Sequence, residues 1–224
     1  MENKKLIIIT GHYGSGKTEY AVNKVLSLAK EYGSAEIADL DIVNTYFRTR
    51  EIKDFLNSKN VRVVDSNLGN NTLDLPALSP GIMGVIESEN VFSVLDVGGD
   101  AIGAKVLARF KNNVEREDYE LLFVINANRP QTQEVSKTVE YARAIEATSG
   151  LKITGLVNTT HMLKDTEVAD VLRGHELCVE VSKITGIPIH EEVCLRDIAK
   201  KVDNIDIQKK LFPIDLYMRS DWMS

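Results

Sequence analysis

The chain has 224 residues, of which 43% are hydrophobic and 27% charged, and its formal net charge is -6 at pH 7. These values are typical of a globular protein and exclude a fibrous or disordered one, and the acidic balance disfavours nucleic acid as a partner. No apolar run is long enough to span a membrane and no signal-peptide core is present, so we expect a cytoplasmic protein.

Apolar runs alternate with amphipathic stretches along the chain, which is typical of β-α units that build a parallel sheet covered by helices. We therefore predict an α/β fold in three layers, α-β-α, with a mostly parallel sheet of about seven strands. The expected strands are residues 5–10, 35–40, 61–65, 92–97, 120–126, 152–158 and 187–190. No repeat or linker divides the chain, so we expect a single domain over 1–224, with the tail 207–224 docked on it.

The segment that follows the first expected strand reads G-H-Y-G-S-G-K-T and fits the phosphate-binding loop pattern G-x-x-x-x-G-K-[ST] without a mismatch. Its glycines let the loop curl so that backbone N–H groups point at phosphates, and the next helix adds its positive N-terminal end. The lysine would reach the β- and γ-phosphates, and the threonine hydroxyl would bind Mg²⁺. The motif and its context predict a P-loop NTPase fold and a nucleotide site at Gly11, Gly14, Ser15, Gly16, Lys17 and Thr18.

Two carboxylates follow the second expected strand, in the sequence A-D-L-D-I-V-N. Asp39 and Asp41 would point to the same side of an extended chain because side chains alternate with period two. At the carboxyl end of a strand beside the phosphate loop, they are placed to orient a water and to complete the Mg²⁺ shell.

The fourth expected strand ends in D-V-G-G-D, the arrangement of a Walker B carboxylate followed by a D-x-x-G switch. Asp96 would hold Mg²⁺ through water, and the Gly99 N–H would sense the γ-phosphate. Glycine suits that position because it has no Cβ to keep its backbone from a ligand.

These segments together resemble the MinD/ParA-like branch of the P-loop NTPases, the SIMIBI-class group that also contains the nitrogenase iron protein and CobQ/CobB-type nucleotide-binding domains. The resemblance extends over the P-loop, the D-L-D-I-V-N-x-Y-F-R stretch, the D-V-G-G-D switch and two later strand ends that bear asparagine. It implies that Asp41 positions the attacking water, that Asp39 lies nearer Mg²⁺, and that Asn158 contacts adenine.

The base preference follows from a motif that differs from the guanine signature. The stretch N-A-N-R-P at 126–130 is not the N-K-x-D of most guanine-specific GTPases. We therefore expect ATP rather than GTP, together with Mg²⁺.

The chain also departs from the MinD/ParA pattern. His12 stands where these relatives carry a lysine that crosses a dimer interface, which leaves a homodimer as an open alternative. Cys178 and Cys194 form no C-x-x-C, so we expect buried thiols and no iron-sulfur cluster. The tail has some membrane-binding composition, but Pro213 interrupts it, which favours docking on the protein over binding to a membrane.

The leading functional hypothesis is a slow Mg²⁺-dependent ATPase that acts as a nucleotide switch for an unidentified protein partner. Lys17, Asp39 and Asp41 would then be the catalytic residues, and Arg48 and Arg129 are candidate local charge stabilisers. Two alternatives stay open: an ATP-dependent small-molecule ligase or kinase, and a nucleotide-binding module with negligible turnover.

Overall fold

A computed structural model describes residues 6–40, 52–65 and 80–218 of the chain. Its described residues form one sheet of eight strands in the order β3-β2-β4-β1-β5-β6-β7-β8, and every neighbouring pair is parallel. The strands are β1 (Leu6–Gly11), β2 (Ala35–Asp39), β3 (Val61–Asp65), β4 (Phe92–Asp96), β5 (Tyr119–Ile125), β6 (Gly155–Asn158), β7 (Ile189–Leu195) and β8 (Leu211–Ile214).

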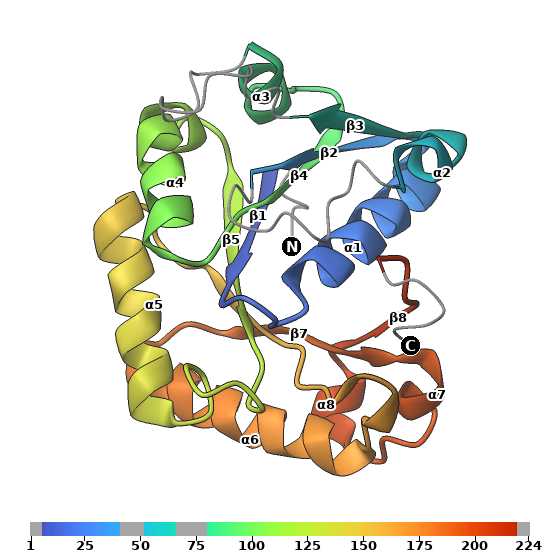
Figure 1. The fold of residues 1–224 in the computed structure, drawn as a ribbon, viewed down its shortest axis with the longest axis vertical. Helices are drawn as coiled ribbons and strands as arrows, with labels where there is room; N and C mark the ends of the chain where they lie inside the picture. The colour runs from blue at the N-terminus through green and yellow to red at the C-terminus, as the bar shows by residue number, and fades with distance from the viewer. Residues whose placement is uncertain (1–5, 41–51, 66–79, 219–224) are drawn as a thin grey trace.

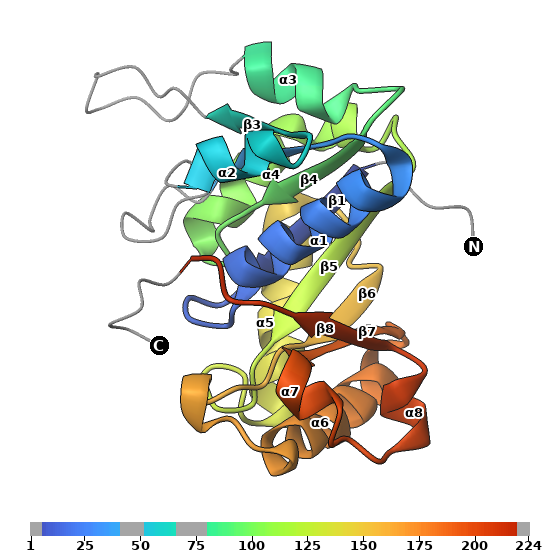
Figure 2. The same ribbon diagram turned by 90° about the vertical axis from the view of Figure 1, so that its right-hand side faces the viewer.

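Helices cover both faces of this sheet, so the expected three-layer α/β fold is confirmed (Figures 1 and 2). The longer ones are α1 (Lys17–Tyr32), α4 (Ala101–Val114), α5 (Val135–Ser149) and α6 (Val168–Thr185). The shorter ones are α2 (Lys53–Ser58), α3 (Pro80–Ile86), α7 (Arg196–Ala199), α8 (Ile205–Gln208) and the 3-10 turn η2 (Leu163–Asp165).

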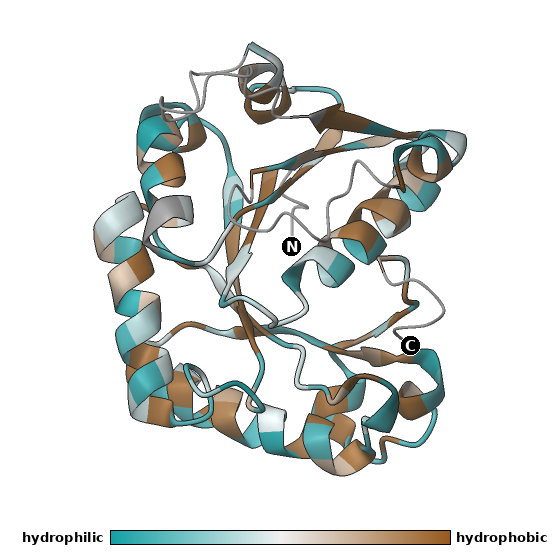
Figure 3. Ribbon diagram, in the orientation of Figure 1, coloured by the Kyte–Doolittle hydropathy of each residue, from teal (hydrophilic) through white to brown (hydrophobic). Residues whose placement is uncertain are grey.

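Two hydrophobic clusters hold the layers together, one on each face of the sheet. One joins the sheet to α1 and α2, and the other joins it to α3, α4, α5 and α6. Ile8 and Ile9 of β1 belong to opposite clusters and are both fully buried, as expected for a strand covered on both faces. Figure 3 shows mostly apolar strands between helices in which apolar and polar residues alternate.

The sequence predicted about seven strands, and the eighth lies inside the predicted tail. Strand β8 has the sequence L-F-P-I and pairs in parallel with β7 at the edge of the sheet. An edge strand tolerates Pro213, which cannot donate a backbone hydrogen bond, and the same proline hid the strand from pattern analysis.

Strand β7 also extends beyond its expected end at residue 190, through the polar sequence H-E-E. Glu192 lies in this extension and is fully buried, which its residue type does not suggest. Its carboxylate accepts a hydrogen bond from Asn158 Nδ2 at 2.7 Å and lies 2.6 Å from His175 Nδ1. Burial raises the pKa of Glu192, although both contacts favour its charged form.

The sheet order places the phosphate-loop strand at a switch point. From β1 the chain runs by way of α1 to β2 on one side, and β5 lies on the other side of β1. In open parallel sheets the crevice at the carboxyl ends of the strands on such a point is where ligands bind. None of the helices among the described residues is long and apolar enough to cross a membrane.

Candidate functional site

The phosphate-loop motif connects β1 directly to α1. Strand β1 ends at Gly11 and α1 begins at Lys17. Gly16 precedes the helix with φ 89°, a left-handed conformation that a residue with a Cβ rarely adopts, and no side chain caps the first turn. The N–H groups of that turn are therefore directed into the loop, where the helix dipole favours an anion.

The D-V-G-G-D segment lies directly on this loop. A Cβ built on Gly99 would be 2.2 Å from the carbonyl oxygen of Gly11, so the two backbones are in contact with no room for a side chain. Asp100 caps α4 by accepting a hydrogen bond from the Gly103 N–H at 2.8 Å. The structure thus brings together two motifs that lie 88 positions apart in the sequence.

Tyr141 of α5 connects the same two motifs. Its hydroxyl donates a hydrogen bond to the Gly99 carbonyl at 2.7 Å, and its ring meets the ring of His12 edge-on, with centroids 5.8 Å apart. Burial and the nearby Asp100 charge raise the pKa of Tyr141 to about 12, so the hydroxyl remains a donor at neutral pH. No pattern in the sequence indicates Tyr141, because its packing partners come from two distant loops.

The predicted metal ligands lie at the carboxyl edge of the sheet. Asp39 of β2 pairs in register with Asp96 of β4. On the other side of β4, Asp96 pairs in register with Ile9 of β1, the strand that leads into the phosphate loop. Asp96 is fully buried, and Thr18 in the first turn of α1 is 8% exposed. Carboxylate and hydroxyl oxygens fit Mg²⁺, which binds one or two carboxylates together with phosphate oxygens and water. Asp41 and Arg48 lie outside the described residues.

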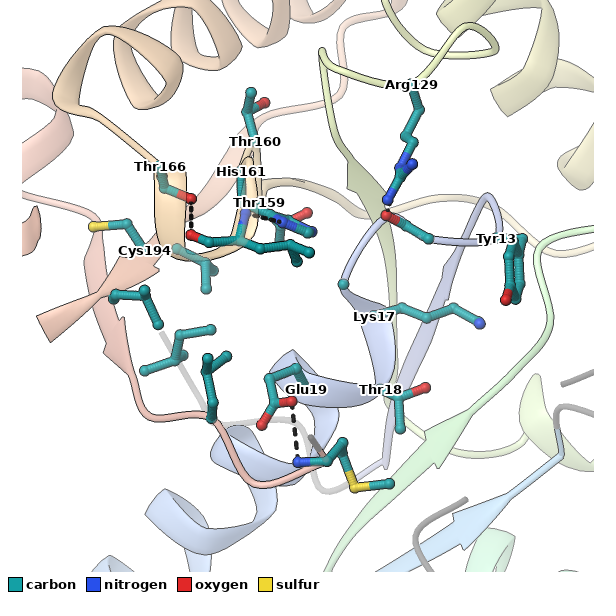
Figure 4. A pocket seen from close by; sticks show the side chains of 18 residues that line it. Tyr13, Lys17, Thr18, Glu19, Arg129, Thr159, Thr160, His161, Thr166 and Cys194 are labelled. Atoms are coloured by element: carbon teal, nitrogen blue, oxygen red, sulfur yellow. Dashed lines mark hydrogen bonds between the residues drawn. The ribbon is translucent and has the colours of Figure 1, made fainter. Parts of the chain in front are cut away.

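Beside the loop is a cavity of about 200 Å³. Lys17 and Thr18 lie on one side of it and Thr166 and Cys194 on the other (Figure 4). The lining also includes a set of apolar residues, which we call the apolar side: Val193, Leu195, Ile214, Leu216 and Met218. The cavity is smaller than the roughly 300–1,000 Å³ of pockets that enclose a whole ligand, so a nucleotide bound in it would lie partly outside it.

Arg129 and Thr159 hold the phosphate loop through hydrogen bonds to its backbone carbonyl groups. Arg129 donates from Nε to the Gly14 carbonyl at 2.8 Å, and Figure 4 shows its side chain reaching down to the loop. The Thr159 hydroxyl donates to the carbonyl of Ser15 and lies 3.2 Å from the carbonyl of Ile125. Arg129 was predicted only as a candidate charge stabiliser, and no pattern in the sequence indicated Thr159.

Asn158 is fully buried and does not line the cavity. Its Nδ2 donates to the Val171 carbonyl at 3.0 Å and to Glu192, and its Oδ1 accepts from the Thr160 N–H at 3.0 Å. The residues after it, Thr159–His161, are the ones that reach the cavity. The adenine contact that the resemblance implies for Asn158 stays a prediction.

The two cysteines are buried, as expected. Burial is the main cause that raises the pKa of each thiol, to about 11 for Cys194, so both are protonated at neutral pH.

No protein-family model and no curated protein matches the sequence, but solved structures match the fold. The signal recognition particle receptor FtsY from Elizabethkingia anophelis, in complex with GDP, aligns with a TM-score of 0.51 and 16% identity over 85% of this chain and 57% of that one. FtsY from Thermotoga maritima gives 0.53 and 18% over 85% and 62%. A nucleotide-binding protein from Archaeoglobus fulgidus, in complex with ADP, gives 0.51 and 14% over 89% and 86%.

The chain spans less than two thirds of the length of these FtsY chains. At such low identities the likeness shows the fold alone, a three-layer α/β fold of the P-loop NTPase kind. The predicted P-loop NTPase fold is therefore confirmed, whereas the MinD/ParA branch in particular stays a prediction.

Proposed function

We propose that this chain is a Mg²⁺-dependent nucleoside triphosphatase that turns over slowly and acts as a switch for a protein partner. The observation that carries the proposal is the direct backbone contact of Gly99 with Gly11. A γ-phosphate held by the loop would lie beside the D-x-x-G segment, whose position would then depend on whether that phosphate is present. Such switches commonly hydrolyse at about 10⁻⁴ to 10⁻² per second without an activating partner.

Each residue of the site then has a role. Backbone N–H groups of the loop bind the phosphates, Lys17 neutralises the β- and γ-oxygens, and Gly99 contacts the γ-phosphate. Thr18, Asp39 and Asp96 would hold Mg²⁺, which supplies charge neutralisation on the phosphates. Asp41 would orient the attacking water. All act within one nucleotide-binding domain, which we place in the cytoplasm.

We propose ATP as the preferred nucleotide on the evidence of this chain's own residues. Both bases occur among proteins of this fold, since one neighbour holds GDP and another ADP. The described residues that line the cavity include one carboxylate, Glu19, and both of its oxygens accept backbone N–H groups of the chain itself. That carboxylate is already engaged and is poorly placed to read the N–H donors of guanine.

The partner and the oligomeric state belong to the same proposal. The chain has His12 in place of the crossing lysine of the MinD/ParA pattern, and this side chain packs against Tyr141 of the same chain, so we propose that any homodimer forms without such a lysine. Light scattering with ATP, ADP or no nucleotide would detect a homodimer that depends on the γ-phosphate.

The deciding experiment is phosphate release from ATP and GTP with Mg²⁺, alongside direct nucleotide binding. Lys17→Ala should lose binding, whereas Asp41→Ala should bind normally and lose turnover. Lys30→Ala is the matched control, because Lys30 is an exposed lysine at the other end of the same helix. If the native chain binds nucleotide tightly but releases no phosphate, even with candidate partners, the chain is a nucleotide-binding module with negligible turnover. No binding of either nucleotide would refute the proposal.

A further inference from the structure

The apolar side of the cavity is built from the C-terminal part of the chain. Ile214, Leu216 and Met218 line it together with Val193, Cys194 and Leu195 of β7. A nucleotide has a polyanionic end and a planar base with two apolar faces. Apolar side chains suit the base, and the phosphate loop suits the other end.

Two residues of α1 hold this C-terminal segment in place. Asn23 donates from Nδ2 to the Asp215 carbonyl at 2.8 Å and accepts from the Asp215 N–H at 3.0 Å. Glu19 accepts hydrogen bonds from the N–H groups of Tyr217 and Met218, the second at 3.2 Å. Figure 4 shows the second of these bonds as the dashed line from Glu19. Because Glu19 and Asn23 are four residues apart, they lie on one face of the helix. Their side chains form hydrogen bonds with backbone groups of the segment, as a neighbouring strand would.

Helix α1 is also the helix that begins with Lys17 and Thr18. The element proposed to bind the phosphates therefore also fixes the apolar wall. Both Glu19 and Asn23 are buried, at 9% and 7% exposure, so their hydrogen bonds are shielded from water. A buried acceptor that lost its donor would be costly, which ties the segment to this position.

Further contacts attach the segment to other elements. Asp215 accepts from Arg196 Nε at 2.8 Å with both carboxylate oxygens. The Tyr217 ring lies beside the ring of Phe55 in α2, with centroids 5.3 Å apart. The wall is thus attached to α1, α2 and α7 as well as to β7.

We infer that residues 214–218 form the base subsite of the nucleotide pocket, and that Glu19 and Asn23 are its positioning residues. This inference rests on the proposed function and specifies where the base binds. Because the docked segment contacts the base, nucleotide binding and docking of the segment stabilise each other to the same extent. Inorganic tripolyphosphate, which has no base, would bind at the loop without using the wall.

Leu216→Ser tests the wall directly. Leu216 lines the cavity and is 39% exposed, so its replacement removes apolar contact with little effect on the core. Titrations should show ATP binding weakened by roughly tenfold and tripolyphosphate binding unchanged. Ile205→Ser is the matched control, since Ile205 is 69% exposed on α8 and does not line the cavity.

Glu19→Gln tests the positioning residue, because it replaces one acceptor oxygen with an NH₂ group that cannot accept from a backbone N–H. ATP binding should again weaken while tripolyphosphate binding is kept. Glu31→Gln makes the same chemical change at an exposed position of the same helix and should alter neither. Circular dichroism and thermal unfolding would establish that each variant is folded.

The outcomes separate the two proposals. If the native chain binds neither ATP nor tripolyphosphate, the proposed function fails and the base subsite fails with it. If the native chain binds both, and Leu216→Ser binds ATP as tightly as the native chain does, the proposed function stands and the base subsite is wrong. Equal weakening of ATP and tripolyphosphate in Leu216→Ser would also overturn it, because the wall would then act on the phosphate end.

Discussion

The two sides of the cavity are built in different ways. The phosphate side consists of one continuous loop whose backbone N–H groups and lysine come from eight consecutive residues. The apolar side takes its residues from β7, from η2 and from the segment 214–218, and depends on side-chain contacts between α1 and residues about two hundred positions away. The first side can be recognised in a sequence because its chemistry is local, and the second becomes visible only when the chain is folded.

The largest expected effect is that of Gly99→Ala. The added Cβ would lie 2.2 Å from the Gly11 oxygen, so the switch segment and the loop must separate. Displacement of about 1 Å at a reacting group can cost about a hundredfold in rate, and we expect phosphate release to fall by at least that factor. Gly84→Ala is the control, because a Cβ there meets nothing within 4 Å. It should raise the melting temperature, since alanine favours a helix by up to about 1 kcal/mol over glycine. Normal turnover by Gly99→Ala would show that this contact is dispensable.

Arg129→Ala should weaken the binding of every ligand that the phosphate loop holds. It removes the hydrogen bond to the Gly14 carbonyl that fixes the loop. We expect ATP and tripolyphosphate to lose affinity by the same factor, about fivefold to tenfold, in contrast to Leu216→Ser. Arg143→Ala, an exposed arginine on α5, should leave both affinities unchanged. A loss confined to ATP would place Arg129 on the base side instead.

Tyr141→Phe should separate turnover from binding. The variant loses the hydrogen bond to Gly99 and keeps the ring, so we expect about a fivefold lower rate of phosphate release with ATP affinity unchanged. The pKa of Tyr141 is raised to about 12, so the stabilising contribution of its protonated hydroxyl is complete below the ordinary pKa of 10.0 and would be lost only near pH 12. The ratio of the two rates should therefore be constant between about pH 6 and about pH 9. A ratio that varies over that range would contradict the raised pKa.

The smallest effect concerns Cys194, on the apolar side. Because its pKa is raised to about 11, alkylation by iodoacetamide should be slow at neutral pH and accelerate as the pH approaches that value. ATP should slow the reaction further, and tripolyphosphate should not. Mass spectrometry would distinguish Cys194 from Cys178, which is more deeply buried and does not line the cavity. Equal protection of Cys194 by ATP and by tripolyphosphate would contradict the assignment of the base to the apolar side.

The sequence was sufficient for the features that depend on short-range patterns. Continuous apolar runs predicted the inner strands, because a strand buried on both faces has no polar positions. The octapeptide at 11–18 predicted the loop between β1 and α1, since its glycines are required by the backbone itself.

The features that could not be predicted depend on distant partners. Glu192 reads as a surface residue until Asn158 and His175 are found beside it. Pro213 reads as a break in a tail until β7 is seen to pair with its strand. No motif includes Tyr141, and its contacts with His12 and Gly99 follow from how α5 lies against two loops.

The bond between Glu19 and Met218 joins residues 199 positions apart, and this separation has a consequence in time. A ribosome adds about 5–20 residues per second, so the wall is synthesised on the order of 10–40 s after the helix that holds it. Contacts of such long range are also slow to form, because a large loop must close first. If residues 214–218 bind the base as we infer, the part of the site that holds the base is therefore the last part to be synthesised, long after the phosphate loop.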